Sequence, residues 1–168
     1  SVNGYRSDVW NSDDGVGWRQ VLSRAEWSPR EGQVAFVFQD KLWMVGGVNF
    51  GERKEKRDIW VTEDGLKWTE VASTTPWSPR YDHAVSEFQG KLWYSGGVGL
   101  DGKAKSDLWV SEDGKNWTLA IQDAPWGVRH GHASLVFKDL LWVIGGWNTE
   151  EDVGRSDSWY SADGYSWH

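Results

Sequence analysis

The feature that most constrains the fold of this chain is a repeat of about 50 residues. Asp-x-Trp begins at Asp8, Asp58, Asp107 and Asp157, and these positions are 50, 49 and 50 residues apart. Of the 15 tryptophans, all but Trp147 recur at corresponding positions. A period of this length predicts an array of units, each of which buries its apolar faces only against its neighbours. We therefore treat residues 1–168 as one segment, with full units 8–57, 58–106 and 107–156 and a fourth beginning at 157.

The sequence of each unit predicts four short antiparallel strands. In the second unit, segments 58–61 and 67–71 flank Asp64-Gly65, a typical hairpin turn. Segment 82–88 alternates apolar and polar residues, and 92–97 is an apolar strand that ends in Gly-Gly. Apolar character on both faces is typical of a strand between two packed sheets. Because no segment shows a sustained 3.6-residue apolar period, we expect an all-β fold with essentially no helix.

These motifs together resemble the kelch repeat, whose period is also about 50 residues. The resemblance covers nearly the whole chain and rests on the Asp-x-Trp pairs, the Gly-Gly pairs 46–47, 96–97 and 145–146, and a final tryptophan at Trp18, Trp68, Trp117 and Trp167. It implies a β-propeller, in which four-stranded blades surround a central channel. The Ser/Thr-x-Asp-Gly hairpins are similar to the Asp-box of sialidases and other bacterial propellers, shortened by one residue. In that family the box is a turn-forming element away from the active site.

The number of strands predicts about three and a half blades. In each blade the first two strands are the inner pair, nearest the channel, and the last two form the outer hairpin. The chain begins with an outer hairpin, continues through three inner pairs, each followed by an outer hairpin, and so ends with a fourth outer hairpin. Kelch-like propellers usually close with about six or seven blades, so the resemblance implies that this chain leaves apolar blade faces and strand edges uncovered. We expect a homodimer in which two copies complete a six-bladed ring. A fragment of a longer chain, or an excised or engineered half-propeller that self-assembles, is the alternative.

The sequence Trp-x-x-Arg occurs at 27–30, 77–80 and 126–129, each time just before an apolar strand. In a propeller these connections and the loops after the second strand of each blade lie at one mouth of the channel. In kelch repeats a cation at this position hydrogen-bonds backbone carbonyls of the neighbouring blade. Alternatively, the arginines form a ring that binds carboxylates, to which guanidinium offers bidentate donors.

The residues near these arginines differ between units, which is where we expect ligand specificity. The predicted ligand-binding residues are Arg30, Arg80 and Arg129, the residues that follow them (Glu31, Tyr81 and His130), and Asn49, Trp147 and Asn148 in the loops. Phe50, Tyr81 and Trp147 offer aromatic surfaces for sugar rings or for a peptide.

Other reactive chemistry is sparse. With no cysteine, the chain has no disulfide framework, no cysteine-based zinc site and no crosslinked cofactor of the galactose oxidase kind. His83 and His132 share one repeat position with Gln33, which favours a structural hydrogen bond over catalysis or metal binding. We expect no cofactor, no metal and no catalytic residue.

The overall charge narrows the choice of partners. A formal net charge of -7 and a pI near 5.0 argue against nucleic acid and anionic membranes, and no apolar run of 18 residues predicts a membrane span. We expect a non-enzymatic binding module that presents its loops and channel mouth to a protein or carbohydrate ligand, anionic ligands included. The alternative is a carbohydrate-active enzyme that resembles the kelch-like sialic-acid epimerases, for which Glu31 or His130 would have to be the general base. The Trp-rich units resemble exported bacterial proteins, periplasmic or extracellular.

Overall fold

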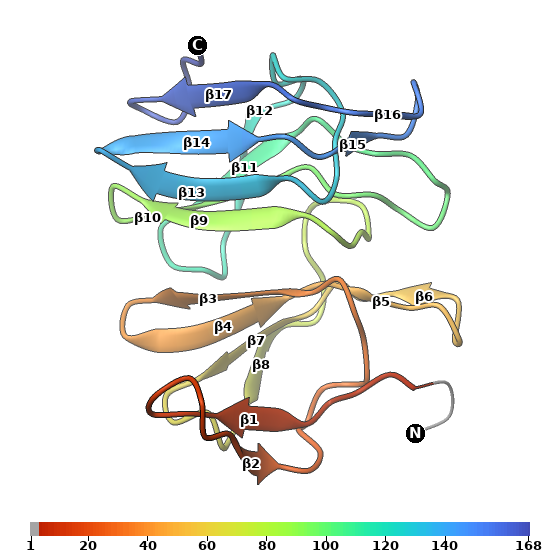
Figure 1. The fold of residues 1–168 in the computed structure, drawn as a ribbon, viewed down its shortest axis with the longest axis vertical. Helices are drawn as coiled ribbons and strands as arrows, with labels where there is room; N and C mark the ends of the chain where they lie inside the picture. The colour runs from red at the N-terminus through yellow and green to blue at the C-terminus, as the bar shows by residue number, and fades with distance from the viewer. Residues whose placement is uncertain (1–3) are drawn as a thin grey trace.

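The computed structural model describes residues 4–168, and these form an all-β fold (Figure 1). Three sheets follow one another along the chain, and we call them the first, second and third blades. The first consists of β3 (Val34–Phe38), β4 (Lys41–Val45), β7 (Ile59–Thr62) and β8 (Thr69–Ala72). The second consists of β9 (Ala84–Phe88), β10 (Lys91–Ser95), β11 (Leu108–Ser111) and β12 (Thr118–Ile121). The third contains β13 (Ala133–Phe137), β14 (Leu140–Ile144) and β17 (Ser158–Ser161).

Shorter hairpins complete the architecture. An N-terminal hairpin of β1 (Val9–Asn11) and β2 (Arg19–Leu22) precedes the first blade. Two loop hairpins, β5 (Val48–Asn49) with β6 (Lys54–Glu55) and β15 (Trp147–Asn148) with β16 (Val153–Gly154), follow the second strands of the first and third blades. No helix is present between residues 4 and 168, and so none there is long and apolar enough to cross a membrane.

Each complete blade is an antiparallel meander, with its strands hydrogen-bonded in chain order. In the third blade the backbone groups of Tyr160 and His168 bond to each other at 2.9 Å in both directions, which continues the sheet beyond β17. The predicted four-stranded antiparallel units are therefore present. The N-terminal hairpin corresponds only to the outer half of such a unit.

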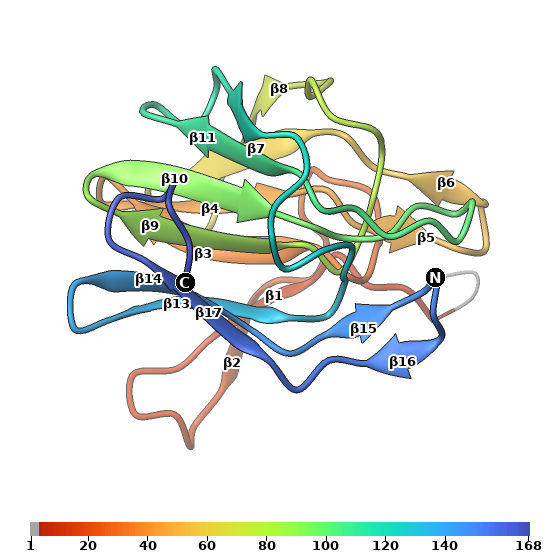
Figure 2. The same ribbon diagram turned by 90° about the horizontal axis from the view of Figure 1, so that it is seen from above.

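The blades stack in chain order along the long axis of the molecule (Figure 1). Their first strands β3, β9 and β13 are neighbours, with β9 in the middle. The loop hairpins β5–β6 and β15–β16 project from the same side in both views (Figures 1 and 2), and we call this the mouth side. Among the described residues the sheets form an arc with an open face at each end.

Tryptophan fills the space between neighbouring sheets. Trp77 and Trp117 pack edge to face at 5.1 Å in the core between the first and second blades. The same pair recurs as Trp27–Trp68 and Trp126–Trp167, each at 4.4 Å. Each pair joins the connection before a blade to that blade's outer hairpin. Such aromatic pairs add roughly 0.5–1.5 kcal/mol beyond the area that they bury, which explains why the repeat retains them.

A second repeated contact joins one blade to the next. Trp43 lies on Gly114 in the outer hairpin of the second blade, where a Cβ atom would be 2.9 Å from the ring. Trp93 lies in the same way on Gly164 of the third blade. We refer to these as the Trp–Gly contacts. They require glycine, because any side chain would overlap the indole ring.

Candidate functional site

The arginines of Trp-x-x-Arg stand where each chain segment enters the first strand of its blade, but their side chains turn inward. Arg30, Arg80 and Arg129 are only 4%, 2% and 0% exposed. Each guanidinium forms a bidentate ion pair with the aspartate of Asp-x-Trp in the same blade. The pairs are Arg30 with Asp58 (2.5 and 2.7 Å), Arg80 with Asp107 (2.5 and 3.0 Å) and Arg129 with Asp157 (3.0 and 2.9 Å).

Each ion pair belongs to a network that unites the three repeated motifs. The Nη1 group of each arginine also donates to the carbonyl of the first glycine of a Gly-Gly pair, at 2.9, 3.1 and 2.8 Å for Gly46, Gly96 and Gly145. The same aspartates accept the indole N–H of Trp60, Trp109 and Trp159. These carbonyls lie in the arginine's own blade, which corrects the expectation that the neighbouring blade supplies them.

The network favours the ionised form of Asp58 and Asp157. Burial alone would raise the pKa of Asp58, but the hydrogen bonds and charge of Arg30 outweigh it and lower this pKa. The hydrogen bonds of Arg129 hold the pKa of Asp157 at about 2. Each guanidinium is therefore already neutralised within the blade, which supports the scaffold interpretation of these residues. A ligand carboxylate would reach them only by displacing an aspartate, so their predicted role in ligand binding remains a proposal.

The residues after each arginine line the mouth side. Glu31, Tyr81 and His130 make antiparallel backbone bridges to Val48, Val98 and Trp147. One residue further on, Gly32, Asp82 and Gly131 all have positive φ angles, of 62°, 53° and 61°. The backbone N–H of Asp82 donates to Gly32 at 3.0 Å, and that of Gly131 donates to Asp82 at 2.8 Å. This chain of bonds fixes the three blades relative to one another at the mouth.

Five residues on the mouth side have side chains near Tyr81 or Asp82, and we call them the mouth cluster: Glu31, Phe50, Tyr81, Asp82 and His130. Phe50 and Tyr81 pack edge to face at 5.2 Å, and Phe50 is 41% exposed. The Nδ1 atom of His130 is 3.7 Å from a carboxylate oxygen of Asp82, whose side chain is 41% exposed. Partial burial and the charges of Asp82, Glu55 and Glu31 raise the pKa of Tyr81. The accessible groups of the mouth cluster are thus aromatic and acidic.

The remaining predicted residues have other surroundings. Asn49 and Asn148 are 5% and 3% exposed and shape their loops. Asn49 donates to the carbonyl of Pro29 at 3.0 Å and accepts from the N–H of Glu52, while Asn148 accepts from the N–H groups at 150 and 151. Trp147 is 43% exposed at the open end of the third blade, whereas its repeat equivalents Val48 and Val98 are buried.

Asp82 was not among the residues predicted from the sequence. The signal was present, because Asp82 occupies a repeat position that is glycine in the other two units. What the sequence alone did not show is that this position requires a left-handed backbone, which makes a residue other than glycine unusual there.

His83 and His132 are buried and neutral. Burial, with the nearby charge of Arg80 for His83 and Arg129 for His132, lowers the pKa of each to about 3. The Nε2 atom of His132 is 2.8 Å from the hydroxyl oxygen of Ser95, and His83 stacks on Tyr94 at 4.5 Å. Among residues 4–168 no group of three potential metal ligands comes together. Both histidines lie between blades and serve packing.

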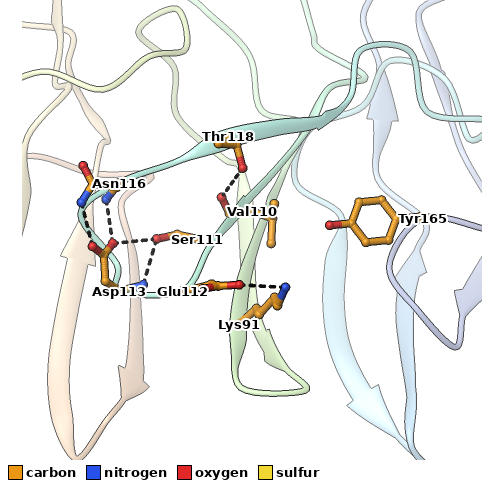
Figure 3. Close-up of a pocket in the computed structure, with 8 residues that line it drawn as sticks. All are labelled: Lys91, Val110, Ser111, Glu112, Asp113, Asn116, Thr118 and Tyr165. Atoms are coloured by element: carbon orange, nitrogen blue, oxygen red, sulfur yellow. Dashed lines mark hydrogen bonds and ion pairs between the residues drawn. The ribbon is translucent and has the colours of Figure 1, made fainter.

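A groove of about 530 Å³ lies near the turns of the second blade, at the end of its strands opposite the mouth (Figure 3). Lys91 and Glu112 form an exposed ion pair of 2.9 Å across it, and Tyr165 forms a wall from the third blade. Asp113 accepts the backbone N–H groups of residues 115 and 116, which builds the hairpin turn. The first blade repeats this arrangement with Lys41 and Glu63 at 2.7 Å. Because the groove repeats along with the scaffold, the mouth cluster is the better candidate for a specific site.

Comparison with known proteins agrees with the architecture. No protein-family model matches the chain, and no curated protein matches its sequence. Among solved structures it resembles one titled "Structure of YjhT", with a TM-score of 0.76 and 17% identity over 96% of this chain and 52% of that one. The fold is β-propeller-like. The chain spans about half the length of YjhT, and at this identity the likeness concerns the fold alone.

Proposed function

We propose that this chain is a kelch-type propeller segment that acts as a non-enzymatic binding module and holds its ligand at the mouth cluster. The observation that carries the proposal is Asp82. The other two units have glycine at this position, whereas this unit has an aspartate with a φ of 53° on the mouth side. A left-handed backbone at a residue other than glycine costs of the order of 1 kcal/mol, and such strain gathers at functional sites.

The composition of the mouth cluster suggests a neutral carbohydrate. The Phe50–Tyr81 pair presents an apolar surface on which a sugar ring can pack. The carboxylates of Asp82 and Glu31 accept hydrogen bonds from sugar hydroxyl groups. An anionic ligand suits this site less well than we expected from the sequence, because Arg30, Arg80 and Arg129 are paired with aspartates within the blades and the accessible charges of the mouth cluster itself, Glu31 and Asp82, are negative.

A carbohydrate-active enzyme is the second candidate, and the proximity of His130 to Asp82 is the observation that favours it. An imidazole 3.7 Å from a carboxylate could act as a general base toward a sugar bound against Tyr81. The two functions differ in the fate of the sugar. A binding module returns it unchanged, whereas an enzyme shifts its anomeric or epimeric proton signals in an NMR spectrum recorded over time.

A neutral-glycan array followed by isothermal titration calorimetry tests the proposal. Tyr81→Ala and Asp82→Gly should each weaken the binding of a sugar identified on the array by at least tenfold. Asp139→Gly is the matched control, because Asp139 also has a positive φ, of 57°, but lies in the turn at the far end of the third blade. No binding on the array, or equal affinity of Asp82→Gly and the parent chain, would contradict the proposal.

A further inference from the structure

The two open ends of the arc carry the two halves of the Trp–Gly contact. Inside the arc, Trp43 lies on Gly114 and Trp93 lies on Gly164. The third tryptophan of the series, Trp142, is partly exposed on the open face of the third blade. At the other end of the arc, Gly65 of the first blade has no atom within 4 Å of the position that a Cβ would occupy. One end therefore offers the indole ring and the other offers the glycine that receives it.

The inner strands repeat this complementarity. His83 lies against Gly46 of the preceding blade, and His132 lies against Gly96. Gly145 is the next glycine in the series, and only a backbone atom of its own blade, the carbonyl oxygen of Arg155 at 3.4 Å, is close to it. Gln33, the repeat equivalent of the two histidines, is exposed at the opposite end.

On one face of the third blade, residues are exposed whose repeat equivalents in the first two blades are buried. Phe38 and Phe88 are 4% and 3% exposed, whereas Phe137 is 55% exposed. Val45 and Ser95 are 1% and 2% exposed, whereas Ile144 is 38% exposed. Strand register places Leu135, Trp142 and Tyr160 in one row across the same face. The open face of the third blade, formed by Leu135, Phe137, Trp142, Ile144 and Tyr160, is thus an inter-blade surface without its neighbour.

The N-terminal hairpin lacks the arginine of the buried network. Asp58, Asp107 and Asp157 each pair with an arginine, but Asp8 forms no ion pair with any residue of the described part of the chain. It accepts instead from the side chains of Trp10 and Gln20. The hairpin is the outer half of a blade whose inner half would supply that arginine.

Residues 6–18 and 155–167 share the pattern Arg-Ser-Asp-x-Trp-x-Ser-x-Asp-Gly-x-x-Trp. In the isolated chain, β17 of the second segment pairs with β14 and Asp157 pairs with Arg129. Because residues 6–18 and 155–167 share this pattern, either segment can occupy the position beside β14.

We propose that a second copy of this chain closes the arc by exchange of this segment. The N-terminal hairpin of one copy replaces residues 155–168 beside β14 of the other, and Asp8 takes over the ion pair with Arg129. Trp142 of each copy then lies on Gly65 of the other, and Gln33 covers Gly145. Both junctions are the same by two-fold symmetry, and the two copies together supply six pairs of inner strands for one ring.

The mass of the 168-residue chain, measured by light scattering across a range of concentrations, gives the first test. A dimer is expected, and a monomer at all concentrations would overturn the proposal. Phe137→Asp should raise the dissociation constant at least a hundredfold. Leu119→Asp should not, because Leu119 is also exposed (41%, against 55% for Phe137) but lies in β12, an outermost strand away from both open faces. Gly65→Asn should weaken the dimer, and Gly102→Asn is its control at a similar φ in a loop.

A pair of aspartate variants tests the exchange itself. Asp8→Asn should weaken the dimer at least tenfold and leave the monomer folded. Asp157→Asn removes the partner of Arg129 only in the unexchanged chain, and so it should shift the population toward the dimer. Near-UV circular dichroism checks that each variant is folded, and Phe137→Asp decides the outcome if Asp157→Asn does not fold. A dimer that responds equally to both aspartate variants would overturn the exchange.

Discussion

At the scale of single residues, the most buried charged groups of this fold are the arginines of the three Arg–Asp ion pairs. Arg80 is 2% exposed, and it bonds to Asp107 and to the carbonyl of Gly96. Taking one partner from such a pair leaves the other charge buried without compensation, which typically costs about 3–5 kcal/mol. Exposed pairs such as Lys91–Glu112 contribute little, because water screens both charges.

This contrast gives a prediction for paired substitutions. Arg80→Leu should lower the free energy of unfolding by roughly 3–5 kcal/mol, because Asp107 and the Gly96 carbonyl lose their donor. Lys91→Met should leave it nearly unchanged. Urea denaturation followed by tryptophan fluorescence measures both variants, and equal stabilities would contradict a structural role for the buried pair.

The buried histidines make stability depend on pH. The pKa of His83 is about 3 in the folded chain against 6.5 for a free side chain, because burial and the charge of Arg80 disfavour the protonated form. Between these two values the unfolded state binds the proton and the folded state does not. The stabilisation is therefore complete above pH 6.5 and is lost as the pH falls toward 3.

His83→Gln tests this dependence with the residue that the first unit already has at position 33. The parent chain should lose roughly 1 kcal/mol per pH unit for each of His83 and His132 between about pH 6 and pH 4. In the variant only His132 should contribute, so the change in the free energy of unfolding per pH unit should fall by about half. Urea titrations at several pH values measure it, and an unchanged slope would mean that His83 takes up a proton in the folded chain.

At the scale of the structural element, the Trp–Gly contacts determine how one blade meets the next. Gly114 and Gly65 occupy the same turn position, with φ angles of 74° and 73°. Only Gly114 lies under a tryptophan, Trp43. Comparing the two sites therefore separates the need for a positive φ in the turn from the need for space under the indole ring.

Alanine substitutions at Gly65 and Gly114 measure the two contributions to the free energy of unfolding. Gly65→Ala should cost about 1–2 kcal/mol, the typical cost of a left-handed backbone for a residue with a Cβ. Gly114→Ala should cost about 1–3 kcal/mol more, because the new methyl group overlaps the Trp43 ring. Both variants are made in the Phe137→Asp background, in which no second copy covers Gly65, and thermal or urea unfolding gives the difference. Equal losses would show that the blades move apart without cost.

At the scale of the whole molecule, the arc leaves apolar residues uncovered at its ends. Phe137, Trp147 and Tyr160 at one end are between 38% and 55% exposed. Burial of such surface is the main favourable contribution to association, and an assembly that buries it ties folding to protein concentration.

Dilution therefore provides a prediction for the intact chain. Each tenfold dilution should weaken an obligate dimer by about 1.4 kcal/mol of free energy and lower its melting temperature. The Phe137→Asp variant should melt at a temperature that is independent of concentration. Calorimetry across a hundredfold range checks both, and a constant melting temperature for the parent chain would contradict assembly.

The sequence was sufficient to predict the four-stranded antiparallel units, their order and their turns. Those features follow from local chemistry that is visible in the chain: Asp-Gly turns, alternating strands and tryptophans at a 50-residue period. The candidate site was harder to predict from the sequence. Glu31, Tyr81 and His130 were expected at the mouth and lie there, but Asn49 and Asn148 proved to be buried in their loops, and Asp82 was missed.

The amino-acid sequence by itself thus determined that this chain is a tandem array of β-sheet units with tryptophan between them, because period and turn chemistry are local properties. Only the tertiary structure decided what each repeated charge does. Arg30, Arg80 and Arg129 are neutralised by aspartates 27 or 28 residues away, and this pairing depends on where the chain returns in space. The tertiary structure also showed which repeated residues are buried and which are exposed, as with Phe88 and Phe137, since burial is a property of neighbours and not of the residue itself.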